Sequence, residues 1–500
     1  MYPLAHRTTL TFLLPLDGEV AVRRRSGAPR SRPAPAVTRP TGTPSATQVA
    51  NGWKAHAGQG LRLVLPDPRL ADAVEASRRS LLLLHRPVGD GARMGTVAGS
   101  ARMLGTLARF GASAEVAEAI PSLLARQGAD GGIDEVDGSD ATGPVLDLVG
   151  EHWRLTRDRA AIDGLAPVLA AAVERLDRAH GGGQPGGGAP SAVVDAGTAT
   201  LARLEALRGV LSAAEVLDAL GEEQAAIDAR AGAGRRRADV SAWLAALAAA
   251  PASPPHPVDP AALDPAAPQA LAARWPLRLV DGDDAALASV TDLVRGRGCV
   301  GPAVFDALGG GLSPSCTLVL AALEVEAGDR RALERLDWVL AAASATWTWP
   351  TTIHPRVDGG CAGEGHDGRV AADLLDVVRH LLVRTTDDGG LALCSLIPDG
   401  WLGQQLEVHD APTPHGLVSF AVRWHGDRPA LLWELQPHDP AAAVVLTAPG
   451  LDRGWSTTDL RGDALLAPVP PPPPPADPEP DPVGPATPVR LTPRRPSPPS

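Results

Sequence analysis

A repeat of apolar residues three and four positions apart runs through most of the chain between residues 67 and 384. This spacing is that of an amphipathic α-helix, because residues at such positions share one helical face. The clearest example occupies relative positions 0, 3, 4, 7 and 8 of one segment: Val145, Leu148, Val149, His152 and Trp153. Clusters of glycine, proline and aspartate divide the region into about a dozen predicted helices. Their ranges are 67–85, 97–110, 114–127, 141–156, 159–179, 192–208, 212–231, 238–249, 284–296, 314–327, 329–344 and 367–384.

Helices of this length joined by short loops are typical of antiparallel helical hairpins. Such hairpins pack either in a ring or in a solenoid. A solenoid normally shows sequence similarity at a fixed period, and this chain has none that we detect. The sequence therefore favours a mainly α-helical ring, with loops at one end of the ring forming a cleft.

The apolar period changes to two after residue 385. Val418, Phe420, Val422 and Trp424 alternate with residues that are small or polar, and a second apolar run covers residues 430–435. The segment between the two runs is a turn sequence, so the pattern predicts a β-hairpin. Residues Thr8–Val22 are a second hairpin candidate.

Two segments have the composition of disordered chain. Residues 24–50 mix arginine, proline, serine and threonine without an apolar period. The C-terminal segment contains a run of prolines, which favours an extended polyproline conformation. We expect it to be a solvated tail, with docking to an aromatic-lined adaptor domain as the alternative. The predicted organisation is a short N-terminal β segment and disordered linker in 1–60, a helical domain in 61–385, a small β domain in 386–466 and a Pro-rich tail in 467–500.

Charge and composition exclude several classes of protein. The net charge of −12 argues against a nucleic-acid surface, which needs clustered positive charge. No segment reaches the ~18–20 apolar residues of a membrane helix. The four cysteines include no CxxC pair, so we expect reduced thiols, no metal site and no cofactor. These features predict a soluble, cytoplasmic protein.

Several short motifs, taken in order, resemble the six-hairpin glycosidases. The resemblance covers residues 61–465 and includes glucoamylase-like and glycogen-debranching-type proteins, which have an (α/α)6 toroid of helical hairpins with a small C-terminal β domain. The motifs are Leu81–His85, Ala125-Arg126-Gln127 with Asp130-Gly131, Glu151–Thr156, Leu336-Asp337-Trp338, Trp349-Pro350, His354-Pro355-Arg356, Gly359–His366 and Pro398–Gly403.

The resemblance implies binding of an oligosaccharide or α-glucan and hydrolysis of an α-glucosidic bond with inversion. Inversion needs two carboxyl groups, one to protonate the leaving oxygen and one to activate water on the opposite face of the sugar. These groups belong in the loops that form the cleft of the toroid.

Three positions depart from the family pattern. Gly99 and Ser100 stand where the family has an Arg-Asp pair that holds the terminal sugar. The loop that supplies the general acid is a glycine-rich stretch, residues 181–188, without a carboxylate. Thr351 replaces a Glu that is the best candidate for the base. These departures predict a catalytically impaired relative.

Carboxylates near the same loops are the remaining catalytic candidates. Glu364 lies between two glycines ahead of the last helix, and Asp140 follows the acidic loop that contains Asp137. The resemblance makes Glu364 and Asp140 candidate catalytic residues and Asp137 a candidate sugar ligand. The alternative for all three is a solvated turn or a helix N-terminal cap, which the helix dipole stabilises.

Four further residues are candidate substrate-binding residues. Asp195 matches an acid at the start of a helix in the family, where it binds sugar or caps the helix. Trp349 either stacks on a sugar ring or anchors the β segment by packing. His354 and His366 flank Cys361, but the spacing lacks a zinc-ligand pattern, so no metal is predicted.

Three functions remain open from the sequence. The first is a glycosidase-like protein with an eroded catalytic apparatus, which the low aromatic content of 3% favours, because sugar clefts are usually lined with aromatic rings. The second is an active inverting hydrolase that uses relocated carboxylates such as Asp140 and Glu364. The third is a helical scaffold whose Pro-rich tail recruits a partner.

Overall fold

The computed structural model describes residues 44–84, 96–135, 139–181, 194–249, 263–356 and 359–469. The chain divides into two compact units, residues 1–56 and 57–500, and each is described by itself. The predicted N-terminal hairpin, the proline run and the glycine-rich loop at 182–188 lie outside the described residues.

The described part of the first unit is a helix, α1 (Ala46–Ala57). The prediction of disorder for residues 24–50 is therefore wrong at its C-terminal end. Ser45 and Gln48 form a reciprocal capping box, since each side chain accepts a hydrogen bond from the other residue's backbone N–H at 3.2 and 2.8 Å. The Ser-x-x-Gln spacing is a helix start signal that lies within the segment of disorder-like composition.

The second unit is mainly helical. Its helices are α2 (Pro68–Leu84), α3 (Val97–Arg109), α4 (Ser113–Leu124), α5 (Thr142–Thr156), α6 (Arg159–Ile162), α7 (Ala166–Gly181), α8 (Val194–Leu220), α9 (Glu223–Ala248), α10 (Ala266–Ala270), η2 (Leu271–Ala273), α11 (Ala285–Arg297), α12 (Pro314–Ala327), α13 (Arg331–Ala341), α14 (Gly368–Leu382) and η3 (Asp399–Trp401). Most of the predicted helices are confirmed within a few residues at each end, but the predicted helix 159–179 is wrong as one helix, because the structure divides it into α6 and α7. None of the helices in the described ranges combines the length and apolarity that crossing a bilayer requires.

The structure has two long helices, α8 and α9, where the sequence predicted three shorter ones. The predicted boundaries of the helices at 192–208, 212–231 and 238–249 are therefore wrong. Gly209 in α8 lies directly against the backbone of Gly143 in α5, so a side chain at that position would collide with α5. The glycine therefore marks close helix packing rather than a helix end. This contact brings the polar side chains of α5 and α8 together.

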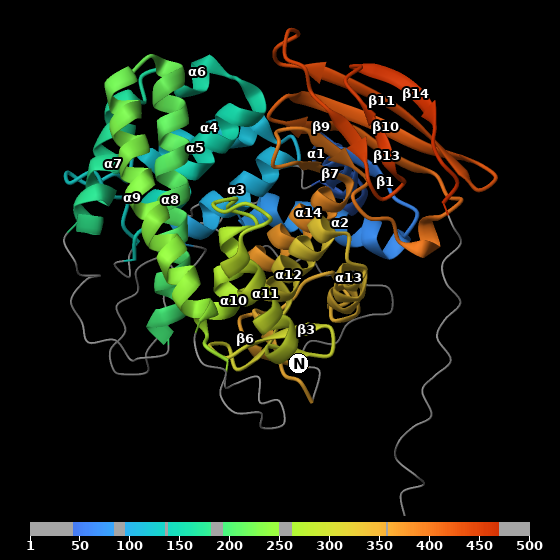
Figure 1. The fold of residues 1–500 in the computed structure, drawn as a ribbon, viewed down its shortest axis with the longest axis horizontal. Helices are drawn as coiled ribbons and strands as arrows, with labels where there is room; N and C mark the ends of the chain where they lie inside the picture. The colour runs from blue at the N-terminus through green and yellow to red at the C-terminus, as the bar shows by residue number, and fades with distance from the viewer. Residues whose placement is uncertain are drawn as a thin grey trace, which may run out of the picture. The chain divides into compact units, whose positions relative to one another are not determined.

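Six of the helices and one 3₁₀ turn pack in sequence around a common centre. Helix α3 contacts α5, α5 contacts α8, and α8 contacts α10, which continues into η2 (Figure 1). The 3₁₀ turn η2 contacts α12, and α12 contacts α14. Helix α14 contacts α3 and so closes the series. Helix α12 is buried from Pro314 to Val325, which agrees with its nearly continuous apolar sequence. The polar side chains that these helices carry therefore meet in the interior.

The predicted β-hairpin is confirmed. Strands β10 (Gly416–His425) and β11 (Arg428–Pro437) are antiparallel, with Val418 opposite Leu435 and Phe420 opposite Trp433. They belong to a five-stranded sheet, in the order β1-β9-β10-β11-β14, whose first strand is β1 (Arg62–Val64) from the start of the unit. The other two strands are β9 (Leu406–Thr413) and β14 (Arg461–Leu465).

Two smaller sheets complete the described structure. One has the order β13-β12-β8-β7 and follows α14. The other, in the order β2-β3-β4-β5-β6, lies within the region whose predicted pattern is helical. Their strands are β2 (Cys299–Val300), β3 (Ala303–Asp306), β4 (Gly311–Ser313), β5 (Thr352–Ile353), β6 (Gly360–Ala362), β7 (Val383–Thr385), β8 (Leu391–Leu393), β12 (Leu446–Ala448) and β13 (Asp452–Thr457).

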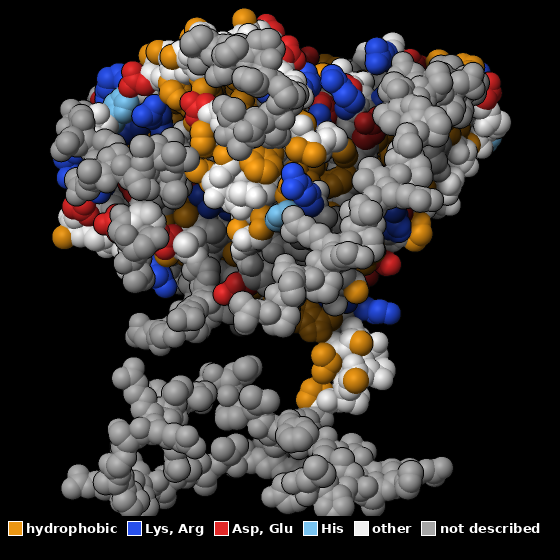
Figure 2. Space-filling model, turned by 90° about the horizontal axis from the view of Figure 1, so that it is seen from below, with side chains coloured by type: hydrophobic (Ala, Val, Ile, Leu, Met, Phe, Trp, Pro, Cys, Tyr) orange, Lys and Arg blue, Asp and Glu red, His pale blue; other side chains and the backbone are white. Residues whose placement is uncertain are grey.

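On the face shown in Figure 2, the described basic side chains are scattered among acidic and apolar ones. The described part of that face therefore has no continuous basic stripe of the kind that neutralises a nucleic-acid backbone. All four cysteines are free, as predicted.

Candidate functional site

The helices around the centre enclose a cavity of about 110 Å³. A second cavity of about 310 Å³ shares part of its lining with the first and extends toward the C-terminal ends of α5 and α14. The first is called the central cavity and the second the arginine chamber. The charged residues that line the central cavity are Arg102, Arg109, Asp147, Glu151, Glu205, Arg208, Arg369, Asp373 and Asp376.

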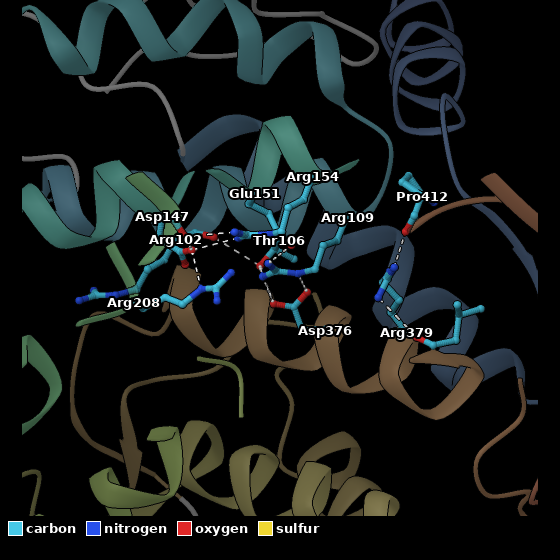
Figure 3. Close-up of polar contacts among 12 residues, drawn as sticks. Arg102, Thr106, Arg109, Asp147, Glu151, Arg154, Arg208, Asp376, Arg379 and Pro412 are labelled. Atoms are coloured by element: carbon cyan, nitrogen blue, oxygen red, sulfur yellow. Dashed lines mark hydrogen bonds and ion pairs between the residues drawn. The ribbon is translucent and has the colours of Figure 1, made fainter. Parts of the chain in front are cut away.

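Arg109 of α3 joins two acidic helices at the centre (Figure 3). Its guanidinium donates to both carboxylate oxygens of Asp376 in α14, at 2.8 and 2.6 Å, and to Glu151 in α5 at 3.0 Å. The hydroxyl of Thr106, one helical turn before Arg109, also donates to Asp376 at 2.8 Å. Because fork-shaped Arg–carboxylate pairs have two parallel hydrogen bonds, Asp376 is held in one orientation.

A second group of ion pairs joins α5 to α8. Asp147 accepts hydrogen bonds from Arg208 at 2.9 Å and from the hydroxyl of Ser212 at 2.8 Å. Arg154, two turns along α5 from Asp147, donates to Glu151 at 2.8 and 3.1 Å and to Asp147 at 3.2 Å. On the neighbouring turn of α8, Glu205 accepts two hydrogen bonds from Arg102 of α3. Each of these carboxylates is therefore paired with at least one arginine.

The pairing decides the ionisation of the acids. Burial raises the pKa of Glu151, but the positive charges of Arg154 and Arg109 outweigh it and hold that pKa well below its ordinary value. The pKa of Asp147 is lowered in the same way, since Arg208 and Arg154 overcome its burial. A carboxylate with a depressed pKa is a weak proton acceptor, so Glu151 and Asp147 are poorly suited to general-base catalysis.

Asp373 of α14 differs from the other acids of the central cavity. Burial raises its pKa to about 6, although Arg369 lies 3.7 Å away and the hydroxyl of Ser315 donates to it. The nearby charge of Asp376 raises the pKa further. A carboxyl group with this pKa can carry a proton near neutral pH, which is the property a general acid requires.

This raised pKa leads to a prediction about stability. Between about pH 4 and pH 6 the folded protein keeps the proton on Asp373, whereas the unfolded chain has lost it. The unfolded state then binds fewer protons, so this group makes the free energy of unfolding fall as pH rises through that range, by up to about 3 kcal/mol. We expect Asp373→Asn to remove that part of the slope, measured by urea denaturation at several pH values between 4 and 7. Equal slopes for the wild type and the variant would contradict the raised pKa.

The structure places the predicted catalytic residues outside the lining of both cavities. Glu364 is exposed in the loop between β6 and α14, and the cap of α14 is Asp367, which accepts from the backbone N–H of Arg369 at 2.9 Å. The capping alternative for Glu364 is therefore wrong. Asp140 is half-buried and accepts from the backbone N–H of Thr142, the first residue of α5, at 2.7 Å, but the N-cap residue of α5 is Ala141, so the alternative of Asp140 as the N-cap is wrong.

The predicted substrate-binding residues are dispersed. Trp349 is fully buried and its indole N–H donates to the carbonyl of Val339 at 2.8 Å, so the ring packs in the core. His354 accepts a hydrogen bond from the backbone N–H of Arg356 at 3.1 Å, and His366 is exposed. Asp195 lies in α8, but its side chain is not described, and Asp137 lies outside the described residues. The assignment of these residues to substrate stays a prediction.

Two of the three departures from the family pattern lie within the described residues, and the glycine-rich loop lies outside them. Gly99 lines the central cavity, and Ser100 beside it is buried with no hydrogen-bond partner for its hydroxyl in the described part of the chain. Thr351 donates to the carboxylate of Asp367 at 2.7 Å. The central acids that the sequence analysis missed are Asp147, Glu151, Glu205, Asp373 and Asp376. Among the described residues, no group of three or more His, Cys, Asp and Glu side chains could hold a metal ion.

Comparison with known proteins identifies the fold. No family model and no curated protein matches this chain. Among solved structures, a GH78 family rhamnosidase of Bacillus sp. GL1 superposes with a TM-score of 0.50 and 14% identity, covering 74% of this chain and 41% of the rhamnosidase. An α-L-rhamnosidase from Dictyoglomus thermophilum also gives a TM-score of 0.50, with 12% identity over 77% of this chain and 45% of that one.

A bacterial glucoamylase complexed with acarbose superposes with a TM-score of 0.45 at 11% identity, covering 66% of this chain and 58% of that one. This chain thus spans less than two thirds of the length of each of these enzymes. The two rhamnosidase likenesses show that the chain has the fold of the six-hairpin glycosidases, as its motifs predict.

Proposed function

We propose that the chain is a carbohydrate-binding protein with a closed (α/α)6 ring and a C-terminal β domain, and that it hydrolyses glycosides poorly or not at all. The closed order of contacts from α3 through α5, α8, α10 with η2, α12 and α14 back to α3 supports the ring. The domain boundaries near residues 385 and 466 belong to the same proposal. In this proposal the sugar occupies the central cavity, to which α3, α5, α8 and α14 contribute charged side chains.

The ion pairs of the central cavity are the observation that supports impaired catalysis. Inverting hydrolysis needs one protonated carboxyl and one free carboxylate on opposite sides of the sugar. Glu205 is tied to Arg102, and Asp147, Glu151 and Asp376 are tied to one or more arginines. The arginines hold the pKa of Glu151 and of Asp147 below its ordinary value, which makes these two carboxylates weak proton acceptors.

The proposed ligand is an α-linked glycoside. Two solved structures that superpose with a TM-score of 0.50 are rhamnosidases, which favours an α-L-rhamnoside. The motifs of the sequence favour an α-glucan. Both sugars carry vicinal hydroxyls that charged side chains can bind through hydrogen bonds.

Calorimetric titration with maltooligosaccharides and with α-L-rhamnosides tests the binding proposal. We expect saturable binding of one class, weakened about tenfold in Glu205→Gln, because a hydrogen bond to a charged group contributes about 1.5–3 kcal/mol. Glu75→Gln is the matched control, since Glu75 pairs with Arg79 on the outside of α2. The absence of binding at millimolar sugar would contradict the proposal that the chain binds carbohydrate.

A second candidate is an active hydrolase in which Asp373 is the general acid, since its pKa of about 6 suits that role. Hydrolysis of nitrophenyl α-L-rhamnoside and α-glucosides distinguishes the two functions. The first proposal predicts no turnover above background in the wild type. Turnover that disappears in Asp373→Asn and persists in Glu364→Gln would instead assign the protein as a hydrolase. A scaffold role for the Pro-rich tail and a cytoplasmic location stay predictions.

A further inference from the structure

The arginine chamber has more positive than negative side chains. Six arginines and four carboxylates line it. The carboxylates are Asp147, Glu151, Glu215 and Asp376, and each has an arginine partner described above or, for Glu215, Arg154 at 2.7 Å. The positive excess therefore comes from arginines that form no ion pair with these four acids.

Arg379 of α14 is the most isolated of these arginines. It is half-buried, and among the described residues its hydrogen bonds go to backbone carbonyls, those of Pro412 and of Val383 at 3.4 Å (Figure 3). Its Nε has no hydrogen-bond partner among the described residues, and no carboxylate forms an ion pair with it there. Burial and the like charge of Arg109 lower the pKa of Arg379 to about 10, so it still carries its charge at neutral pH.

Two more arginines that line the arginine chamber have few negatively charged partners. Arg384 of β7 donates to the hydroxyl of Ser395 at 2.9 Å and has no ion pair with a described carboxylate. Arg278 donates to the carbonyl of Thr385 at 2.9 Å and lies 3.6 Å from Asp387. Burial lowers the pKa of both side chains. Glu326 and Asp387 attract Arg384 and Arg278 from a distance, but the 3.6 Å contact of Arg278 with Asp387 is the one ion pair that Arg278, Arg379 and Arg384 form with a described carboxylate.

Buried charge of one sign is costly unless a counter-charge is near. The carbonyls at the C-terminal end of α14 supply a partial negative charge, but not a full anion. A guanidinium presents a planar set of donors that fits carboxylate and phosphate oxygens, and it cannot lose its proton at neutral pH. A bound oxyanion would therefore offset the excess charge, and the chamber volume of about 310 Å³ accommodates a small one.

We propose that the arginine chamber binds a small oxyanion, a phosphate or carboxylate group, held by Arg379, Arg384 and Arg278. This site goes beyond the proposed sugar binding in the central cavity and does not depend on it. The chamber lies at the C-terminal ends of α5 and α14, next to Pro414 of the loop between β9 and β10. An anion bound there would connect the helical layer to the sheet.

Titration calorimetry of the full chain with inorganic phosphate and with glucuronate, at constant ionic strength set with chloride, tests the site. Uncharged glucose is the control for shape without charge. We expect saturable binding of at least one anion, weakened tenfold or more in Arg379→Gln and in Arg384→Gln. Arg461→Gln on the exposed strand β14 should bind like the wild type.

The outcomes separate the sources of the anion. Binding of phosphate alone assigns a phosphate ligand, and binding of glucuronate alone assigns a carboxylate ligand. If Arg379→Gln does not fold, Arg384→Gln decides, because Arg384 lies in the short strand β7 rather than in the central helix α14. No saturable binding of either anion, or equal binding by both variants and the wild type, would overturn the proposal. A sugar-binding failure in the central cavity would leave these titrations unaffected.

Discussion

Replacing Arg109 by methionine is expected to lower the free energy of unfolding by about 3–5 kcal/mol. Arg109 pairs with Asp376 through two hydrogen bonds and with Glu151 through a third. Methionine keeps the aliphatic stem but leaves two buried carboxylates without their shared cation. A buried carboxylate that loses its counter-charge destabilises the folded state by more than an exposed ion pair stabilises it. We therefore expect a large loss of stability. Urea denaturation followed by tryptophan fluorescence measures it.

The matched control is Arg79→Met on α2. Arg79 forms an exposed i,i+4 pair with Glu75 at 3.5 Å. Exposed pairs of this kind contribute about 0.2–1 kcal/mol, so we expect the control variant to unfold within that margin of the wild type. A loss below 1 kcal/mol for Arg109→Met would mean that water or another cation compensates Asp376 and Glu151. The central ion pairs would then not restrain these carboxylates, and impaired catalysis would lose its support.

Replacing Trp349 by alanine is expected to lower the free energy of unfolding by about 3–5 kcal/mol. Trp349 is among the largest fully buried side chains, and its indole N–H donates to the carbonyl of Val339. Alanine leaves a cavity in the core and an unsatisfied carbonyl. Trp349→Phe fills most of the volume without the hydrogen bond, so we expect an intermediate loss of about 1–3 kcal/mol. Both losses are measured by urea denaturation.

Trp347→Ala is the control for this pair of variants, because Trp347 is only half-buried in the same loop. Its loss should be smaller than that of Trp349→Ala. The sequence-based expectation that Trp349 stacks on sugar makes a different prediction, namely unchanged stability with lost sugar binding. That result would show that the ring turns out of the core when sugar binds.

Local signals predicted the helices with good accuracy. The predicted range 314–327 coincides with α12, and 141–156 differs from α5 by one residue. Apolar spacing and N-terminal proline act within one segment and need no knowledge of the rest of the chain. The alternation at Val418 and Phe420 predicted the hairpin for the same reason, and the register of β10 and β11 confirms it.

The failures arise where a residue's effect depends on a distant segment. Gly209 looks like a helix breaker in sequence, yet it serves as the contact at which α8 approaches α5. Glu364 and Asp140 stand in loops that the resemblance associates with the cleft. Neither lines the central cavity or the arginine chamber of the described residues, whereas Asp373, within a helix, lines the central cavity.

The sequence shows the central acids and arginines at helical spacing, but it does not show that they lie together in space. Arg369, Asp373, Asp376 and Arg379 recur at helical spacing along α14, and Arg102, Thr106 and Arg109 do so along α3. A polar stripe of this kind is usually the solvent face of a helix, so helical spacing alone indicates no function. Only neighbouring helices with equivalent stripes can turn such a face into the lining of a cavity.

The sequence by itself determined that this chain forms amphipathic helices, a β-hairpin and a fold resembling the six-hairpin glycosidases, because these depend on local periodicity and ordered motifs. Only the tertiary structure decided which carboxylates lie together, which arginine neutralises each of them, and which arginines remain without an acid. Those properties depend on Coulomb interactions across a few ångströms between helices far apart in the chain. They distinguish Asp373 from Glu151, and the arginine chamber from the central cavity, although the residue types are the same.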